Sequence, residues 1–147
     1  MTPMANRDLS NAEWRDKAEA YCARAEHCAD DVRRKLYEWQ APAELTESIL
    51  QHLYDCDFIN DERFCRAYVH DKVEYQAWGR MKIQAGLRAL HLPENAIRNA
   101  LDNINEERYR ENLQSLIRQR SAPTSPLPPT TIRFLLQRGF TYEEIHP

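Results

Sequence analysis

A six-residue pattern that occurs twice constrains the fold of this 147-residue chain more than any other feature. Ile59-Asn-Asp-Glu-Arg-Phe64 is matched in residue type, position by position, by Ile104-Asn-Glu-Glu-Arg-Tyr109, 45 residues later. A weaker copy, Ser10-Asn-Ala-Glu-Trp14, lies 50 residues before Asn60. Repeats of this period indicate supersecondary units that bury their faces on one another, and about three units are needed for a stable array.

Apolar residues recur at the spacing of an amphipathic α-helix through most of the chain. Each run predicts a helix with one face in a core. The chain also has only three glycines, whereas a β fold with many tight turns needs more. The sequence therefore predicts an all-α fold. The runs are Trp14/Ala18/Tyr21/Cys22/Ala25, Val32/Leu36/Trp39, Leu45/Ile49/Leu53, Ile83/Leu87/Leu90, Ile97/Leu101/Ile104 and Tyr109/Leu113/Leu116/Ile117.

Together the repeat and the helices predict three tandem three-helix repeats that form an elongated, curved array. We expect the repeats to span residues 10–59, 60–104 and 105–147, the third being shortened. Residues 121–131 hold four of the eight prolines and no charge, so we expect a stiff linker there. The second helices share an apolar pair, and the third helices are expected to begin near Pro42, Pro93 and Thr141. The pairs are Val32/Leu36, Ile83/Leu87 and Ile132/Leu136.

Several local signals predict helix ends. Ser10 with Glu13, and Thr141 with Glu144, have the spacing of capping boxes. Phe140 and Ile145 flank the second box as a hydrophobic staple, Pro93 suits a first helical turn, and Gly139 suits the left-handed position after a helix. Four acidic pairs fall in predicted first turns, where negative charge stabilises a helix, and we interpret them as caps rather than catalytic acids. They are Asp30-Asp31, Asp61-Glu62, Glu106-Glu107 and Glu143-Glu144.

The cysteines and histidines leave two interpretations open. Cys22, Cys28, Cys56 and Cys65 have no C-x-x-C spacing, which favours small buried hydrophobes in a reducing cytosol. The alternative is a metal site, because His52 and Cys56 are four residues apart and His27 and Cys28 lie near Cys22. We expect no metal, no cofactor and no catalytic residues.

Charge and hydropathy place the chain among soluble proteins. The formal net charge of −3 argues against a general polyanion binder, although residues 61–147 carry 13 basic and 11 acidic side chains. No apolar run approaches the roughly 18 residues of a membrane span, and residues 1–10 carry no signal-peptide core. We therefore expect a cytoplasmic protein without membrane contact.

Three predicted helices carry the basic side chains that are candidates for a partner. Such residues contact phosphates or an acidic protein groove; the alternative is a solvated helix face. Two of these helices have no acidic residue, whereas Asp30, Asp31 and Glu38 offset the charge of the third. Trp78 and Tyr75 offer a stacking surface or, alternatively, core packing. The candidates are Arg80, Lys82 and Arg88; Arg133 and Arg138; and Arg33, Arg34 and Lys35.

Three motifs, in this order and spacing, resemble the RecX family of RecA regulators along nearly the whole chain. They are Phe58–Phe64 followed by Ala67-Tyr-Val69, Trp78–Ile83 with Leu87, and Leu135–Phe140. The matching residues with a structural role in the motifs are Asn60, Asp61, Arg63, Phe64, Tyr68, Gly79, Leu87, Gly139 and Phe140. The chain departs from the family pattern at Cys28, at His91 where the family often has glycine, and in the proline-rich linker.

The resemblance implies a non-enzymatic regulator that binds the RecA–DNA filament along its groove. Such proteins limit or destabilise the filament and so lower ATP hydrolysis, strand exchange and co-protease activity. The implied partners are the RecA filament, single-stranded DNA and possibly double-stranded DNA, and we expect a monomer. An alternative is a helix-turn-helix DNA-binding module, against which the net charge and the lack of a single basic recognition helix argue.

Overall fold

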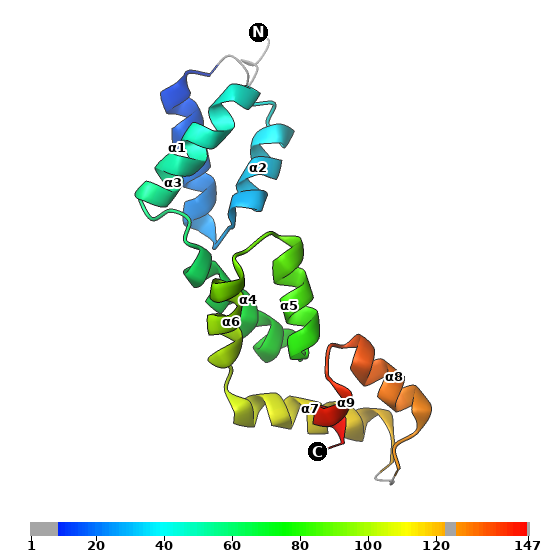
Figure 1. The fold of residues 1–147 in the computed structure, drawn as a ribbon. Helices are drawn as coiled ribbons and strands as arrows, with labels where there is room; N and C mark the ends of the chain where they lie inside the picture. The colour runs from blue at the N-terminus through cyan, green and yellow to red at the C-terminus, as the bar shows by residue number, and fades with distance from the viewer. Residues whose placement is uncertain (1–8, 123–125, 147) are drawn as a thin grey trace. The chain divides into compact units, whose positions relative to one another are not determined.

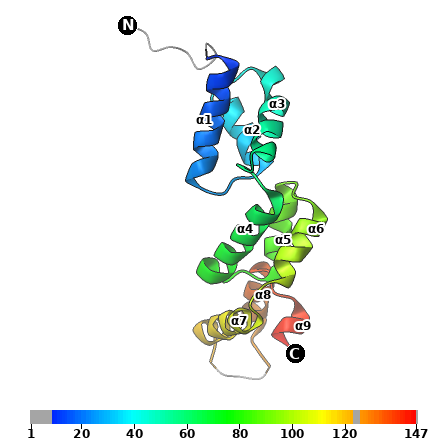
Figure 2. The same ribbon diagram turned by 90° about the vertical axis from the view of Figure 1, so that its left-hand side faces the viewer.

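The structure, a computed structural model, describes residues 9–122 and 126–146, and their regular structure is entirely helical (Figures 1 and 2). This confirms the all-α prediction. Within those residues no helix is both long and apolar enough to cross a membrane. The helices are α1 (Asn11–Arg24), α2 (Ala29–Glu38), the 3₁₀ turn η2 (Ala43–Leu45), α3 (Thr46–Asp55), α4 (Asp61–Gln76), α5 (Arg80–Ala89), α6 (Glu94–Asp102), α7 (Glu106–Arg120), α8 (Pro129–Gln137) and α9 (Tyr142–Ile145).

The α-helices follow one another in the triplets α1–α3, α4–α6 and α7–α9, as the tandem repeat predicts. By its packing the chain divides into two units, one ending at Phe64 and the other beginning at Cys65, inside α4. Three sequence repeats therefore correspond to two compact units. The predicted boundaries of the repeats, 10–59, 60–104 and 105–147, stay a prediction.

The first unit buries the predicted apolar stripes in one core. Helix α3 packs against both α1 and α2. Trp14 and Leu53 are completely buried between these helices, and Leu36 is 2% exposed. Ala25 is the exception among the predicted core residues, because it is the exposed residue that ends α1.

In the second unit α5 packs against α6, α7 against α8, and α8 against α9. Ile83, Leu87, Ile97 and Leu135 are completely buried there. The predicted linker is wrong at its C-terminal end, because residues 129–131 form the first turn of α8. Proline is compatible with that turn, where an N–H has no helical partner. Residues 123–125 of the linker lie outside the described residues.

The predicted helix caps are present. Ser10 and Glu13 exchange two hydrogen bonds of 3.2 Å, and Thr141 and Glu144 exchange bonds of 2.8 and 3.1 Å. All four acidic pairs lie in first turns, as predicted. Pro93 differs slightly from expectation, since it is the residue that precedes α6 rather than part of its first turn.

The second helix of each triplet ends in the same hydrogen-bonded turn. After the helix one residue has a positive φ: 63° at Gln40, 63° at His91 and 107° at Gly139. The next amide N–H donates to the carbonyl of a buried leucine, from Ala41 to Leu36 (2.9 Å), Leu92 to Leu87 (3.2 Å) and Phe140 to Leu135 (3.1 Å). This is the Schellman pattern, in which glycine is favoured at the positive-φ position. The turn confirms the predicted place of Gly139 and shows that two triplets adopt the same geometry without glycine.

Gln40→Gly is expected to stabilise the chain by about 0.5 kcal/mol. The left-handed conformation costs a side-chain-bearing residue about 1 kcal/mol, partly offset by the greater freedom of glycine in the unfolded chain. Gln40→Val is expected to destabilise the chain by about 1 kcal/mol, because a β-branched residue is least compatible with positive φ. Urea denaturation followed by circular dichroism measures both changes, and shifts in the same direction would contradict the assignment.

Candidate functional site

Two glycines far apart in the sequence hold the start of α5 against the residue that follows α8. The Gly79 N–H donates to the Arg138 carbonyl (2.9 Å), and the Met81 N–H donates to the Gly139 carbonyl (3.0 Å). A Cβ atom on Gly79 would overlap the carbonyl carbon of Gly139. The second and third triplets are thus joined backbone to backbone, which requires glycine at position 79.

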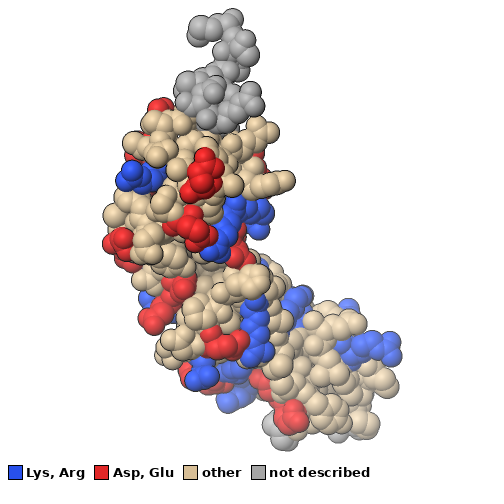
Figure 3. Space-filling model, turned by 45° about the horizontal axis from the view of Figure 1, so that its top comes forward, with Lys and Arg blue, Asp and Glu red and all other residues tan. Residues whose placement is uncertain are grey.

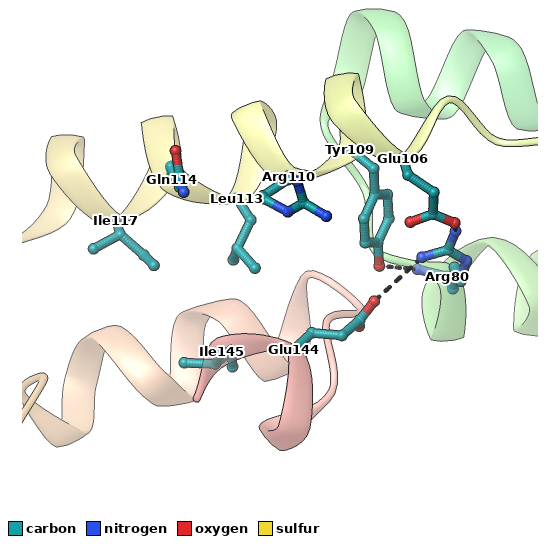
Figure 4. Close-up of a pocket in the computed structure, with 9 residues that line it drawn as sticks. All are labelled: Arg80, Glu106, Tyr109, Arg110, Leu113, Gln114, Ile117, Glu144 and Ile145. Atoms are coloured by element: carbon teal, nitrogen blue, oxygen red, sulfur yellow. Dashed lines mark hydrogen bonds and ion pairs between the residues drawn. The ribbon is translucent and has the colours of Figure 1, made fainter. Parts of the chain in front are cut away.

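Arg80 completes this junction with its side chain (Figure 4). Its guanidinium pairs with Glu106 of α7 and with Glu144 of α9 (3.4 Å), and it lies 4.3 Å from the centre of the Tyr109 ring. Its backbone N–H donates to the Tyr109 hydroxyl (2.9 Å). Burial raises the pKa of Tyr109, so the phenol stays neutral. Arg80 therefore links three helices, and only 26% of its side chain is exposed.

A hollow of about 370 Å³ lies beside Arg80, between α7 and α9 (Figure 4). Leu113 and Ile117 of α7 and Ile145 of α9 line it, and Arg110 and Gln114 lie along the same helix face of α7. The apolar lining and the satisfied ion pairs are typical of a helix joint.

The other candidate cations, which lie on α5, on α8 and directly after α8, differ in the groups that they contact. Lys82 lies 4.3 Å from the Trp78 ring, and the exposed Arg88 pairs with Glu94 (2.7 Å). Arg138 donates to the carbonyls of Gln76 and Ala77, the second at 3.3 Å. Arg133 is exposed and forms no ion pair with any other residue that the structure describes. Of these four side chains, Arg133 is the one most available to a partner.

The two aromatic residues before α5 have different environments. Trp78 is half-buried, and Lys72 and Lys82 lie 4.5 and 4.3 Å from its ring. Tyr75 is 78% exposed. Core packing is therefore the wrong interpretation for Tyr75, since it points away from the joint.

The basic residues of α2 pair with acids, as their sequence neighbours suggest. Arg34 pairs with Asp31 (3.0 Å), and Lys35 pairs with Glu38 (3.5 Å). Arg33 pairs with Asp30 (3.4 Å) and with Glu47 of α3 (3.5 Å). These exposed pairs contribute little to stability, and their arginines can exchange partners at low cost.

A larger basic feature was not among the predicted sites. Residues 110–138, which we call the C-terminal basic segment, contain five arginines and one acid, Glu111. Arg118 and Arg120 lie in the last turn of α7, and Arg120 also lies 3.7 Å from the centre of the Phe134 ring. On the face shown in Figure 3, basic and acidic side chains are interspersed. The positive charge of residues 110–138 is thus a feature of this stretch of sequence.

The repeated motif places an arginine in the same kind of contact twice. Arg63, at the start of α4, pairs with Glu26, which follows α1 (2.5 Å). Arg108, at the start of α7, pairs with Glu74 in the last turns of α4 (3.3 Å). Both arginines connect the start of one triplet to the first helix of the triplet before it. The motif is therefore a structural joint.

The remaining motif residues are also structural. Asn60 and Asn105 each accept a hydrogen bond from the backbone N–H three residues later, at 2.9 and 3.0 Å. Asp61 accepts one from the Tyr54 hydroxyl (2.9 Å). Phe64, Leu87 and Phe140 are buried, whereas Tyr68 is half-buried. These contacts explain why the motif combines a capping residue, acids and an aromatic.

The structure brings one of the Cys/His pairs together. The sulfur of Cys56 lies 3.8 Å from His52 Nδ1, while His52 Nε2 lies 2.6 Å from Glu19. Burial raises the pKa of Cys22 and of Cys28 to about 11, which disfavours the thiolate that a metal needs. Within residues 9–122 and 126–146, no three His, Cys, Asp or Glu side chains are grouped as metal ligands.

The middle of the chain matches one protein-family model. Residues 60–101 match the family model described as RecX, second three-helix domain. A regulatory protein RecX of Clostridium acetobutylicum is 25% identical over 124 residues, covering 78% of this chain and 57% of that protein. A regulatory protein RecX of Thermobifida fusca is 25% identical over 135 residues, covering 85% of this chain and 72% of that protein. The chain thus spans little more than half the length of the first relative.

Two solved structures share the fold. A crystal structure of regulatory protein RecX is similar with a TM-score of 0.75 and 24% identity, covering 91% of this chain and 70% of that one. The crystal structure of RecX from Lactobacillus salivarius also has a TM-score of 0.75, with 21% identity, and covers 92% of this chain and 91% of that one. At these identities the likeness establishes the fold.

Proposed function

The chain belongs to the RecX family, and on this basis we propose that it regulates the RecA recombinase by binding the RecA–DNA filament. In this proposal the bound chain limits the growth of the filament or destabilises it. ATP hydrolysis, strand exchange and co-protease activity then all fall, because each depends on an intact filament. The chain acts by binding and not by catalysis, as a monomer in the cytoplasm.

The match of residues 60–101 to the second RecX domain carries this proposal. The tandem fold supports it physically, since several units that each make modest contacts with one polymer bind it strongly together. The C-terminal basic segment adds five positive charges that attract either DNA phosphates or an acidic groove.

We propose that six basic residues of the second and third triplets make the main contacts with the filament, and that three basic residues of α2 add to them. They are Lys82, Arg88, Arg118, Arg120, Arg133 and Arg138, with Arg33, Arg34 and Lys35 on α2. Arg80 is unsuitable as a test of binding. Its replacement by glutamate would place a third acid beside Glu106 and Glu144 and disrupt the junction as well as any contact.

The direct test follows ATP hydrolysis by RecA on single-stranded DNA after addition of the purified chain. We expect the rate to decline over minutes as filaments shorten, with a parallel loss of strand exchange. An unchanged rate at a chain concentration equal to that of RecA would refute the proposal. A gel shift on duplex DNA without RecA distinguishes this proposal from the alternative of a helix-turn-helix module. Tight, sequence-specific binding to duplex DNA alone would indicate the helix-turn-helix module.

A further inference from the structure

The first unit contains a hollow of about 420 Å³ between α1 and α2 that gathers positive charge in an acidic half of the chain. Lys17 and Arg24 of α1 and Lys35 of α2 line it. Residues 1–60 carry seven basic and twelve acidic side chains, so nearly half of their cations surround this one hollow. Such clustering against the local charge balance points to an anionic ligand.

Helix geometry explains how the cations converge. Lys17, Tyr21 and Arg24 are spaced i, i+4, i+7 and therefore share one face of α1. Lys35 and Trp39 are likewise four residues apart, at the end of α2. The two faces meet at the hollow, whose lining contains both cations and aromatic rings.

The aromatic rings hold the lysines in place. Lys17 Nζ lies 4.5 Å and Lys35 Nζ 5.8 Å from the centre of the same Trp39 ring. Lys35 also lies 5.7 Å from the ring of Tyr21, which stacks on His27 at 3.9 Å. Cation–π attraction orients both ammonium groups before a ligand arrives.

The third cation is the most available one. Arg24 is exposed and forms no ion pair with another residue of the described chain. Lys35 does pair with Glu38 at 3.5 Å, but 36% of the lysine side chain and 51% of the glutamate side chain are exposed, so an incoming anion displaces that acid at little cost. A guanidinium and two ammonium groups around one hollow match the oxygens of a phosphate.

The size of the hollow and its wall indicate what carries the phosphate. A hollow of about 420 Å³ has room for a phosphate together with a sugar and a base. Tyr21, His27 and Trp39 line the hollow, and the ring surface that their mutual contacts leave uncovered packs against a base, which an acidic peptide does not need. We infer that this hollow binds one nucleotide unit of a single-stranded nucleic acid, with its phosphate held by Lys17, Arg24 and Lys35. The inference deepens the proposed function by giving the first unit its own contact with the DNA of the filament.

The test needs no RecA, so its failure is distinguishable from failure of the proposed function. Binding of the full chain to a fluorescent oligothymidylate is measured by anisotropy at several salt concentrations. In the variant Lys17→Gln, Arg24→Gln, Lys35→Gln we expect about tenfold weaker binding and a slope of log K against log salt that is reduced by about 2, from three lost phosphate contacts. The matched control is Arg15→Gln, Arg66→Gln, Arg98→Gln, which removes three exposed arginines outside the hollow and is expected to change affinity less than threefold.

A second readout locates the contact. In a Trp78→Phe background the remaining tryptophans are Trp39 and the completely buried Trp14, so quenching by oligothymidylate reports on the hollow. We expect quenching there and its loss in the triple variant. Equal binding by the triple and control variants would overturn the inference. The inference would also be overturned if polyglutamate competed as strongly as oligothymidylate, because the hollow would then bind an acidic peptide. It would likewise be overturned if thymidine monophosphate competed as strongly at equal nucleotide concentration, because the hollow would then bind a free nucleotide.

Discussion

Gly79→Ala is expected to destabilise the second unit by about 3 kcal/mol, at the upper end of what overpacking usually costs. The added methyl would overlap the Gly139 carbonyl carbon. The start of α5 and Gly139 are both held in place by backbone hydrogen bonds, so neither can move aside easily. Relief therefore requires the start of α5 to move away from the end of α8. That movement breaks the bonds from Gly79 to Arg138 and from Met81 to Gly139. Urea denaturation followed by circular dichroism measures the loss.

Gly86→Ala is the matched control, because it makes the same chemical change in the same helix, α5. Its methyl would meet the hydroxyl end of the Tyr68 side chain, which can rotate away, and alanine is the better helix former. We expect a change within about 1 kcal/mol of zero. A Gly79→Ala protein as stable as the Gly86→Ala protein would show that the backbone junction does not form.

Reversal of three charges in the C-terminal basic segment is expected to weaken filament binding about 100-fold, or about 3 kcal/mol. The variant is Arg118→Glu, Arg120→Glu, Arg133→Glu, at positions that are all exposed. It removes three attractions and adds three repulsions toward phosphates or acidic side chains. The concentration that halves RecA ATP hydrolysis, measured at two salt concentrations, gives the change in affinity and its electrostatic share.

The control for this variant reverses three exposed arginines outside the segment: Arg15→Glu, Arg66→Glu, Arg98→Glu. Both variants have the same net charge, so a general charge effect would weaken them equally. We expect the control to inhibit within about fivefold of the parent chain, since only its long-range attraction changes. Equal inhibition by the two variants would remove the C-terminal basic segment from the contact surface, and circular dichroism checks that both variants are folded.

Local features of this fold were predictable because their causes are local. The stripe of Trp14 and Ala18, the capping boxes and the left-handed Gly139 each depend on residues within a few positions of one another. The C-terminal end of the proline-rich linker was not predictable, because proline is equally compatible with a linker and with a first helical turn. Proline at 129 begins α8.

The candidate site was less predictable because its contacts span long distances in the sequence. Counting charges along α5 makes Arg80 an unopposed cation, yet its acids come from 26 and 64 residues away. Nothing near Gly79 indicates that the chain returns 60 residues later to touch it. Arg24 was not among the predicted candidates, because the second helix that lines its hollow, with Lys35 and Trp39, follows 11 or more residues later in the sequence.

The junction between Gly79 and Gly139 also bears on how such a chain can be divided. A fragment that ends after α6 would leave the amides of Gly79 and Met81 without their hydrogen-bond acceptors. It would also leave the Arg80 guanidinium without its ion-pair partners on α7 and α9. The sequence pattern repeats three times, whereas the packing divides the chain into two compact units. A shortened chain is therefore expected to keep the second unit intact only if it retains α5 together with α7, α8 and α9.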